Sequence, residues 1–208
     1  MPLPIARFAA LIFALGCVAS LLRPALAQGG AGTFAPDDIV AVATGDFDGN
    51  GAPDAAMIVL SSDEDAIDSD LYIFLEGAGE ETPPGKLGLA LHRRGAAWGA
   101  RPLMAGQVPR LTAMSSGSLR IETENIGIGR HAWEQKVTLA YRDGRFRVAG
   151  FTHDAYDKLQ DDEPVSCDLN FFSGKGVLNG EAVTFEAARI PFEDWSDDEA
   201  LRICRIVE

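Results

Sequence analysis

The stretch GDFDGNGAPDAAMIV at residues 45–59 spaces acidic and amide side chains at fixed intervals and then continues directly into an apolar run. Counted from Asp46 as position one, the candidate ligands fall at positions one, three, five, seven and nine: Asp46, Asp48, Asn50, Ala52 through its backbone carbonyl, and Asp54. In calcium loops this alternation directs oxygen atoms toward one point, and a glycine at position six, here Gly51, permits the bend. Position twelve is Met57 instead of glutamate, so we expect a strand-loop-strand hairpin and not a helix-loop-helix unit.

The chemistry of the loop favours one hard cation. Its carboxylates bring a charge of −3, and no His or Cys lies nearby, which predicts Ca²⁺ in preference to a transition metal or Mg²⁺. Phe47 falls between two ligands, so we expect it to point into the core. The alternative is a turn without a metal, because Asp, Asn and Gly favour turns in any case. With one site between two strands, we expect the ion to be structural.

The rest of the chain predicts a mainly β fold. Apolar and alternating runs indicate strands near residues 39–45, 55–60, 71–77, 87–95, 118–127, 133–142, 145–153, 167–172 and 174–190. Asp143-Gly144 and Asn179-Gly180 are typical hairpin turns, and Asp197–Val207 has helical spacing. We therefore expect a compact antiparallel β domain, sandwich-like or a propeller fragment, with the calcium loop at 46–54 and at most a short C-terminal helix. No second copy of the acidic loop supports a complete propeller.

The first residues have the pattern of an export signal. Arg7 precedes an apolar run from Phe8 to Leu22 and the small-residue site Ala25-Leu26-Ala27. We expect residues 1–27 to be a cleaved signal peptide, residues 28–208 to be a single β domain, and the protein to be periplasmic or secreted. The run is too short to span a bilayer. Lipid anchoring through Cys17 is the weaker alternative, because the expected leucine three residues earlier is missing.

The chain is strongly acidic, with a formal net charge of −13. Loss of Arg7 and Arg23 with the leader would leave 16 basic against 31 acidic residues, a net charge of −15. Such a surface disfavours nucleic acid and anionic membranes and favours divalent cations or cationic partners. We expect neither nucleic-acid binding nor stable membrane insertion.

Two cysteines remain after the leader, Cys167 and Cys204. In an exported protein they predict one disulfide, and two buried free thiols are the alternative. Their spacing is not that of a redox or zinc motif. We expect a structural bond that ties the C-terminal segment to the domain.

Other side chains give few signs of catalysis. The three histidines, of which His131 has the most unusual surroundings, lie far apart in sequence and are expected to be packed or solvent-facing. The three tryptophans are expected in the core, and sugar-stacking platforms are the alternative: Trp98, Trp133 and Trp195.

The acidic loop resembles the calcium loop of FG-GAP/VCBS-type repeats, the Asp-x-Asp-Gly-x-Gly-x-x-Asp hairpin also found in integrin propeller blades. The stretches IGRHAWEQKVTLAYRDGRFRVAGFTHDAYD, SCDLNFFSGKGVLNG and DWSDD resemble small single-motif proteins exported by Gram-negative bacteria. Some of those are similar to periplasmic lysozyme inhibitors and to immunity proteins against peptidoglycan hydrolases. The resemblance implies a compact β fold with bound calcium, and it assigns no inhibitory residue here.

These features predict an exported, non-catalytic, calcium-binding protein that binds a partner such as a cationic peptidoglycan hydrolase. One alternative is a carbohydrate-active envelope enzyme that uses paired carboxylates among Asp63, Glu64 and Asp68. Its carboxyl groups would need to lie about 5 Å or about 6.5–9.5 Å apart. Another alternative is a structural envelope protein whose partner the sequence does not identify.

Overall fold

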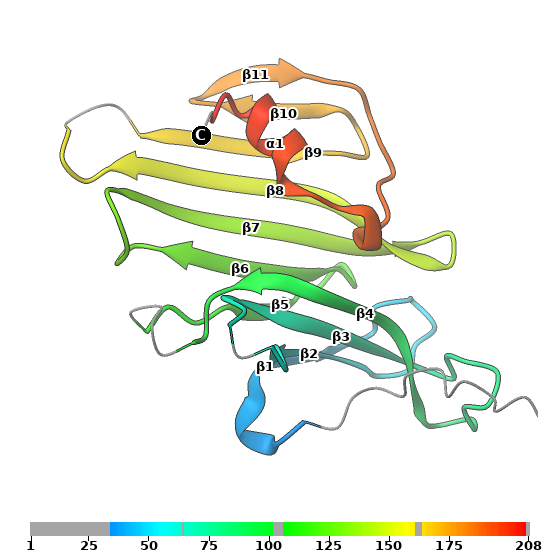
Figure 1. Ribbon diagram of the computed structural model, residues 1–208. Helices are drawn as coiled ribbons and strands as arrows, with labels where there is room; N and C mark the ends of the chain where they lie inside the picture. Colours follow the sequence, from blue (N-terminus) through cyan, green and yellow to red (C-terminus); the bar gives the residue numbers. More distant parts are fainter. Residues whose placement is uncertain (1–33, 64, 102–105, 161–163, 207–208) are drawn as a thin grey trace, which may run out of the picture. The chain divides into compact units, whose positions relative to one another are not determined.

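The computed structural model describes residues 34–63, 65–101, 106–160 and 164–206, which form two antiparallel sheets (Figure 1). The four-stranded sheet has the order β1-β2-β3-β4: β1 (Ile39–Gly45), β2 (Asp54–Leu60), β3 (Asp68–Glu76) and β4 (Leu87–Trp98). The seven-stranded sheet runs from β11 to β5 in reverse chain order: β5 (Arg110–Ala113), β6 (Leu119–Asn125), β7 (His131–Arg142), β8 (Arg145–Asp157), β9 (Val165–Asn170), β10 (Lys175–Leu178) and β11 (Glu181–Thr184). The predicted mainly β fold class is confirmed.

Helical structure is confined to short elements among the described residues. They are the 3₁₀ turns η1 (Pro36–Asp38) and η3 (Phe192–Asp194) and the helix α1 (Asp197–Ile203). Ser196 caps α1, its Oγ accepting from the Asp198 amide at 3.3 Å, so the predicted short C-terminal helix is confirmed. None of these helices has the length and apolar character needed to cross a bilayer.

Two-residue turns close the hairpins as the sequence predicts. Asp143 and Gly144 have φ values of 54° and 77° between β7 and β8, and Asn179 and Gly180 have 49° and 82° between β10 and β11. Positive φ at both positions gives the turn whose twist matches paired strands. The conformation of each turn therefore fixes which residues pair next to it.

One bulge changes the register of the long β7-β8 hairpin. Leu139 pairs with Val148, but the preceding Thr138 pairs with Gly150, so Ala149 is the extra residue. Beyond the bulge, Gln135 lies opposite His153. A bulge of this kind redirects the side chains of one strand relative to its partner.

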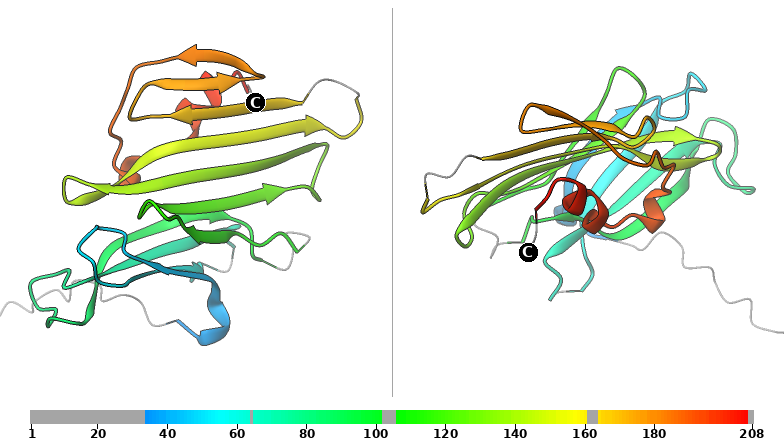
Figure 2. Two further views of the ribbon diagram at one scale, coloured as in Figure 1. Left: turned by 180° about the vertical axis from the view of Figure 1, so that it is seen from behind. Right: turned by 90° about the horizontal axis from the view of Figure 1, so that it is seen from above.

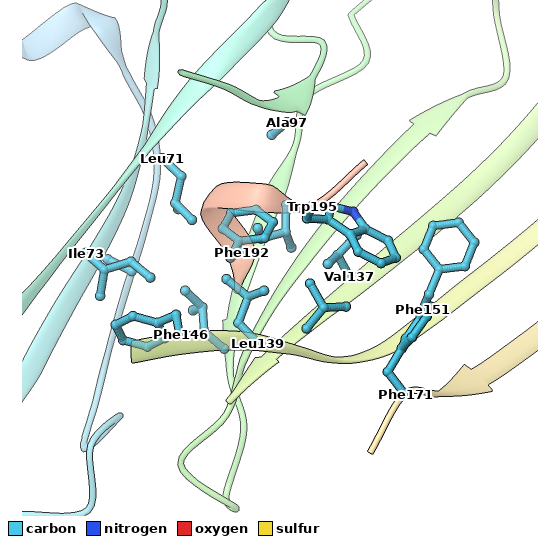
Figure 3. Close-up of a cluster of buried hydrophobic side chains, with 14 of the residues drawn as sticks. Leu71, Ile73, Ala97, Val137, Leu139, Phe146, Phe151, Phe171, Phe192 and Trp195 are labelled. Carbon is cyan, nitrogen blue, oxygen red and sulfur yellow. The ribbon is translucent and has the colours of Figure 1, made fainter. Parts of the chain in front are cut away.

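The two sheets contribute to one hydrophobic core, which the C-terminal segment completes. Leu71 of β3 and Phe151 of β8 are almost fully buried, and Figure 3 shows Phe192 and Trp195 lying between them. Trp195 also packs edge-on against Phe171, with ring centroids 5.2 Å apart. Burial of large aromatic side chains at this position holds the segment around α1 against the seven-stranded sheet.

A disulfide joins Cys167 in β9 to Cys204 at the C-terminus of α1. The S–S bond is 2.02 Å long, both residues are fully buried, and the bond closes a loop across 37 positions. The predicted disulfide is confirmed. Disulfides persist in oxidising compartments, so this bond indicates a location outside the cytoplasm.

Two features of the four-stranded sheet and its neighbour differ from expectation. The segment 39–45 has the composition of a buried strand, yet Ala43 alone is buried and Val42 is 55% exposed. The reason is that side chains alternate along the strand, so Ala43 faces the core while Val42 and Thr44 lie on the solvent face. The short strand β5 was not predicted from the sequence.

The predicted signal peptide, residues 1–27, lies outside the described part of the chain.

Candidate metal centre

The acidic loop connects β1 to β2. Gly45 at the end of β1 pairs with Asp54 at the start of β2, which closes the hairpin around the intervening residues. Phe47 is only 3% exposed and belongs to the core, as its position between two candidate ligands predicts. A methyl group added to Gly45 would lie 3.0 Å from the Phe47 ring, so the small residue makes room for this anchor.

The structure brings three of the predicted residues together. Asp46, Asp48 and Asp54 each offer a carboxylate oxygen, and these oxygens lie within 4.8 Å of one another. Asp54 is 1% exposed, while the other two side chains are half-buried. Such a cluster could hold a metal ion.

Asp54 is held in place by one amide of the loop and one amide of β3. Its Oδ2 accepts from the Phe47 amide at 2.7 Å, and its Oδ1 accepts from the Glu76 amide of β3 at 3.0 Å. Hydrogen bonds from amides to a carboxylate are stronger than neutral ones and offset the cost of burying its charge. Each oxygen keeps a further lone pair, so these bonds orient the carboxylate without preventing it from binding a cation.

Asp46 and the two loop glycines shape the turn. Asp46 Oδ1 accepts from the Gly49 amide at 2.8 Å, and its Oδ2 accepts from the Gly51 amide at 3.0 Å. The two glycines have φ values of +81° and +87°, a region that side chains with a Cβ rarely occupy. The sequence therefore supplies both the acceptor and the backbone freedom that this tight loop needs.

Asp48 and Asn50 form a second set of local contacts. Asp48 Oδ1 accepts from the Asn50 amide at 3.0 Å, and its Oδ2 accepts from Asn50 Nδ2 at 3.1 Å. Asn50 is exposed, and its Oδ1 accepts from the Ala52 amide at 2.7 Å. Neither Asn50 nor the Ala52 carbonyl belongs to the cluster of three carboxylates, so their role as ligands stays a prediction.

Replacing Asp54 by Asn is expected to destabilise the protein even without a metal. The new NH₂ group cannot accept from an amide, so one bond to the Phe47 or Glu76 amide is lost and a buried donor is left unpaired. We expect a loss of about 2 kcal/mol in the free energy of unfolding, measured by urea denaturation in a chelator.

Asp48→Asn is the matched control, because Asp48 receives only bonds from Asn50 within the loop. We expect its unfolding free energy in the chelator to stay within about 0.5 kcal/mol of the unaltered protein. Equal losses in the two variants would contradict the anchoring role of Asp54.

The carboxylates considered for catalysis lie elsewhere. Asp63 and Asp68 line a cavity of about 430 Å³ together with Asp65 and Asp70. Asp63 is exposed, whereas Asp68 is half-buried, and burial followed by the charge of Asp197 raises the pKa of Asp68. Glu64 lies outside the described residues.

Comparison with known proteins gives no match: no protein-family model, no curated protein and no solved structure is significantly similar to this chain.

Proposed function

We propose that the loop 46–54 binds one structural Ca²⁺ in an exported, non-catalytic protein. The observation that carries this proposal is the convergence of three carboxylates, Asp46, Asp48 and Asp54, within 4.8 Å. Oxygens that bind one Ca²⁺ at 2.3–2.6 Å can lie at most about 5 Å apart, which matches this spread. The cluster contains oxygen ligands and no His or Cys, which favours Ca²⁺ over transition metals.

The expected role of the ion follows from what the carboxylates connect. Asp46 begins the loop after β1, Asp54 begins β2, and Asp54 also receives the Glu76 amide of β3. Three like charges in so small a volume repel one another, and a divalent cation converts this repulsion into attraction. A bound ion would therefore stabilise the connection between β1, β2 and β3.

For the whole protein, we propose a binding module for a cationic envelope protein such as a peptidoglycan hydrolase. Two properties support it: the net charge of −13 and the disulfide of an oxidising compartment. An acidic surface accelerates encounter with a basic partner through long-range attraction. The resemblance of the later stretches to hydrolase inhibitors and immunity proteins points to the same class of partner.

The test is an inhibition assay on the mature protein in millimolar Ca²⁺ with a panel of cationic lysozymes and other peptidoglycan hydrolases. We expect inhibition of at least one of them, with an association rate that falls as salt screens the charges. Cytochrome c, which is cationic but cleaves no cell wall, serves as the control partner. Absence of inhibition across the panel, or equally tight binding to cytochrome c, would contradict the proposal.

A further inference from the structure

A cavity of about 1080 Å³ is lined by residues of the seven-stranded sheet, of the end of β4 and of the C-terminal segment that carries α1. Figure 2 (right view) shows this C-terminal segment lying over one face of the sheet. Strands β6, β7 and β8 provide one wall, and the C-terminal segment provides the other. All three tryptophans of the chain line it: Trp98, Trp133 and Trp195. Its volume is at the upper end of the range for small-molecule sites, about 300–1,000 Å³.

A hydrogen-bonded chain runs along the wall of this cavity. Trp195 Nε1 donates to Asp197 Oδ1 at 2.6 Å, and Gln135 Nε2 donates to Asp197 Oδ2 at 2.7 Å. A carboxylate oxygen only accepts, so the Gln135 amide must turn its NH₂ group toward Asp197. The Gln135 Oε1 then faces His153 Nδ1 at 3.2 Å and must accept a hydrogen bond from it.

This chain places the proton of His153 on Nδ1. Its Nε2 is left with an unshared lone pair and has no hydrogen-bond partner among the described residues. The side chain is 5% exposed and lines the cavity. Burial lowers the pKa of His153 from its ordinary value of 6.5 more than the charges of Asp197 and Asp154 raise it, which favours the neutral ring. An acceptor on the cavity wall without a protein partner is open to a ligand hydroxyl, which would donate to it.

The remaining lining decides the charge of the ligand. The lining carries both signs of charge, with Asp68, Asp197 and Asp198 on one side of the balance and Arg93 and Arg130 on the other, which disfavours both a strongly cationic and a strongly anionic ligand. Arg93 is held in place, since its Nη2 donates to the Trp195 carbonyl at 2.6 Å and its guanidinium lies 4.3 Å from the centre of the Phe192 ring. The walls therefore offer donors and acceptors without a dominant charge.

Aromatic surface completes the chemistry. Trp98 and Trp133 are half-buried and meet edge-to-face with centroids 5.2 Å apart, and the Trp133 ring is stacked at 5.9 Å from that of His153. Saccharides combine apolar C–H faces, which pack on indole rings, with hydroxyl groups that donate and accept hydrogen bonds. This pairing matches a pocket of aromatic walls with a few placed polar groups.

We propose that this cavity binds a neutral saccharide longer than one sugar ring, with a hydroxyl donating to His153 Nε2 and sugar faces packed on Trp98 and Trp133. The site uses β4, β6, β7, β8 and the C-terminal segment, with Asp68 at the start of β3, and it shares no residue with the loop 46–54. It therefore does not depend on the metal or on a hydrolase partner.

The test is a tryptophan-fluorescence titration of the mature protein with chitotriose and, separately, maltotriose. Because every tryptophan lines the cavity, we expect a saturable change in emission with at least one of them. His153→Phe keeps the ring but removes the acceptor, so we expect affinity to fall about tenfold or more. His92→Phe is the matched control, since His92 stacks on Tyr72 outside this cavity, and its affinity should be unchanged.

Three results would overturn the proposal: no saturation by either saccharide up to about 10 mM, equal affinity in His153→Phe, or tighter binding of spermidine or citrate than of the saccharides. A thermal melt checks that His153→Phe is folded. If His153→Phe is unfolded, the ¹⁵N chemical shift of His153 Nε2 in the unaltered protein is measured with and without saccharide instead. We expect this chemical shift to change when the saccharide that alters the tryptophan emission is added. An unchanged chemical shift would overturn the proposal.

Discussion

Chelation of calcium is expected to lower the free energy of unfolding by about 4 kcal/mol, relative to the protein at a Ca²⁺ concentration 1,000 times the dissociation constant. The reason is linkage: the loop brings Asp46, Asp48 and Asp54 together only in the folded state, so the ion binds that state selectively. In a chain of this size, such a change corresponds to a fall in Tm of about 10 °C. A thermal melt with Ca²⁺ and with EDTA measures it.

Asp48→Ala is the control for this melt. The side chain contributes one of the three clustered oxygens, yet its hydrogen bonds reach only Asn50. We expect this variant to melt at nearly the same temperature with and without Ca²⁺, close to the chelated unaltered protein. A Tm of the unaltered protein that does not respond to Ca²⁺, or a Ca²⁺ response that survives in Asp48→Ala, would contradict the metal assignment.

Removal of the disulfide is expected to have an effect of similar size. Replacing both Cys167 and Cys204 by Ala frees a loop across 37 positions, and the chain-entropy model gives a loss of about 4 kcal/mol in the free energy of unfolding. Urea denaturation of the double variant measures the loss. Reduction of the unaltered protein should give the same value, because the two treatments remove the same constraint.

Loss of the disulfide should loosen mainly the C-terminal segment around α1. Cys204 caps the C-terminus of α1, and Trp195 lies in the core just before the start of this helix. We therefore expect loosening of the segment to change the tryptophan emission. The metal loop belongs to the other sheet, so Ca²⁺ should still raise the Tm of the double variant by the same amount. Unfolding curves that coincide with and without the bond would show that it does not stabilise the fold.

Local signals explain most of what could be predicted from the sequence. Asp143-Gly144 and Asn179-Gly180 specify their turns through backbone conformation alone, and the spacing of the acidic loop brings its carboxylates together within nine residues. The alternation of side chains then places Phe47 in the core. None of these features requires knowledge of distant parts of the chain.

Features that depend on distant strands could not be predicted in this way. The Glu76 amide binds Asp54 only because β3 pairs with β2, and the loop sequence carries no sign of it. The exposure of Val42 has a similar origin, because the apolar composition of β1 does not indicate that only one face of the strand packs on the core.

The bulge in the β7-β8 hairpin determines which residue lies opposite Gln135 in the cavity wall. Counting back from the Asp143-Gly144 turn without a bulge places Gln135 opposite Thr152, which puts His153 on the other face. The shift at Thr138 and Leu139 brings His153 opposite Gln135 instead. A single extra residue therefore created the hydrogen-bonded chain that fixes its proton.

The three tryptophans differ in burial, although the sequence predicts the same core position for all of them. Trp195 is 5% exposed and lies in the core, as predicted, and its indole N–H is satisfied by Asp197. Trp98 and Trp133 are half-buried at the cavity, so the core prediction is wrong for these two. Composition indicates that tryptophan is buried somewhere, but only the paired sheets and the C-terminal segment determine which rings line a cavity.

The most direct test of the central claim is a high-resolution crystal structure of the mature protein grown in millimolar Ca²⁺, with anomalous data to identify the ion. We expect one ion in the loop between β1 and β2, bound by six to eight oxygens at about 2.3–2.6 Å. Asp46, Asp48 and Asp54 should be among its ligands, together with Asn50 and the Ala52 carbonyl. Carboxylates turned away from one another, with water alone between them, would contradict the account.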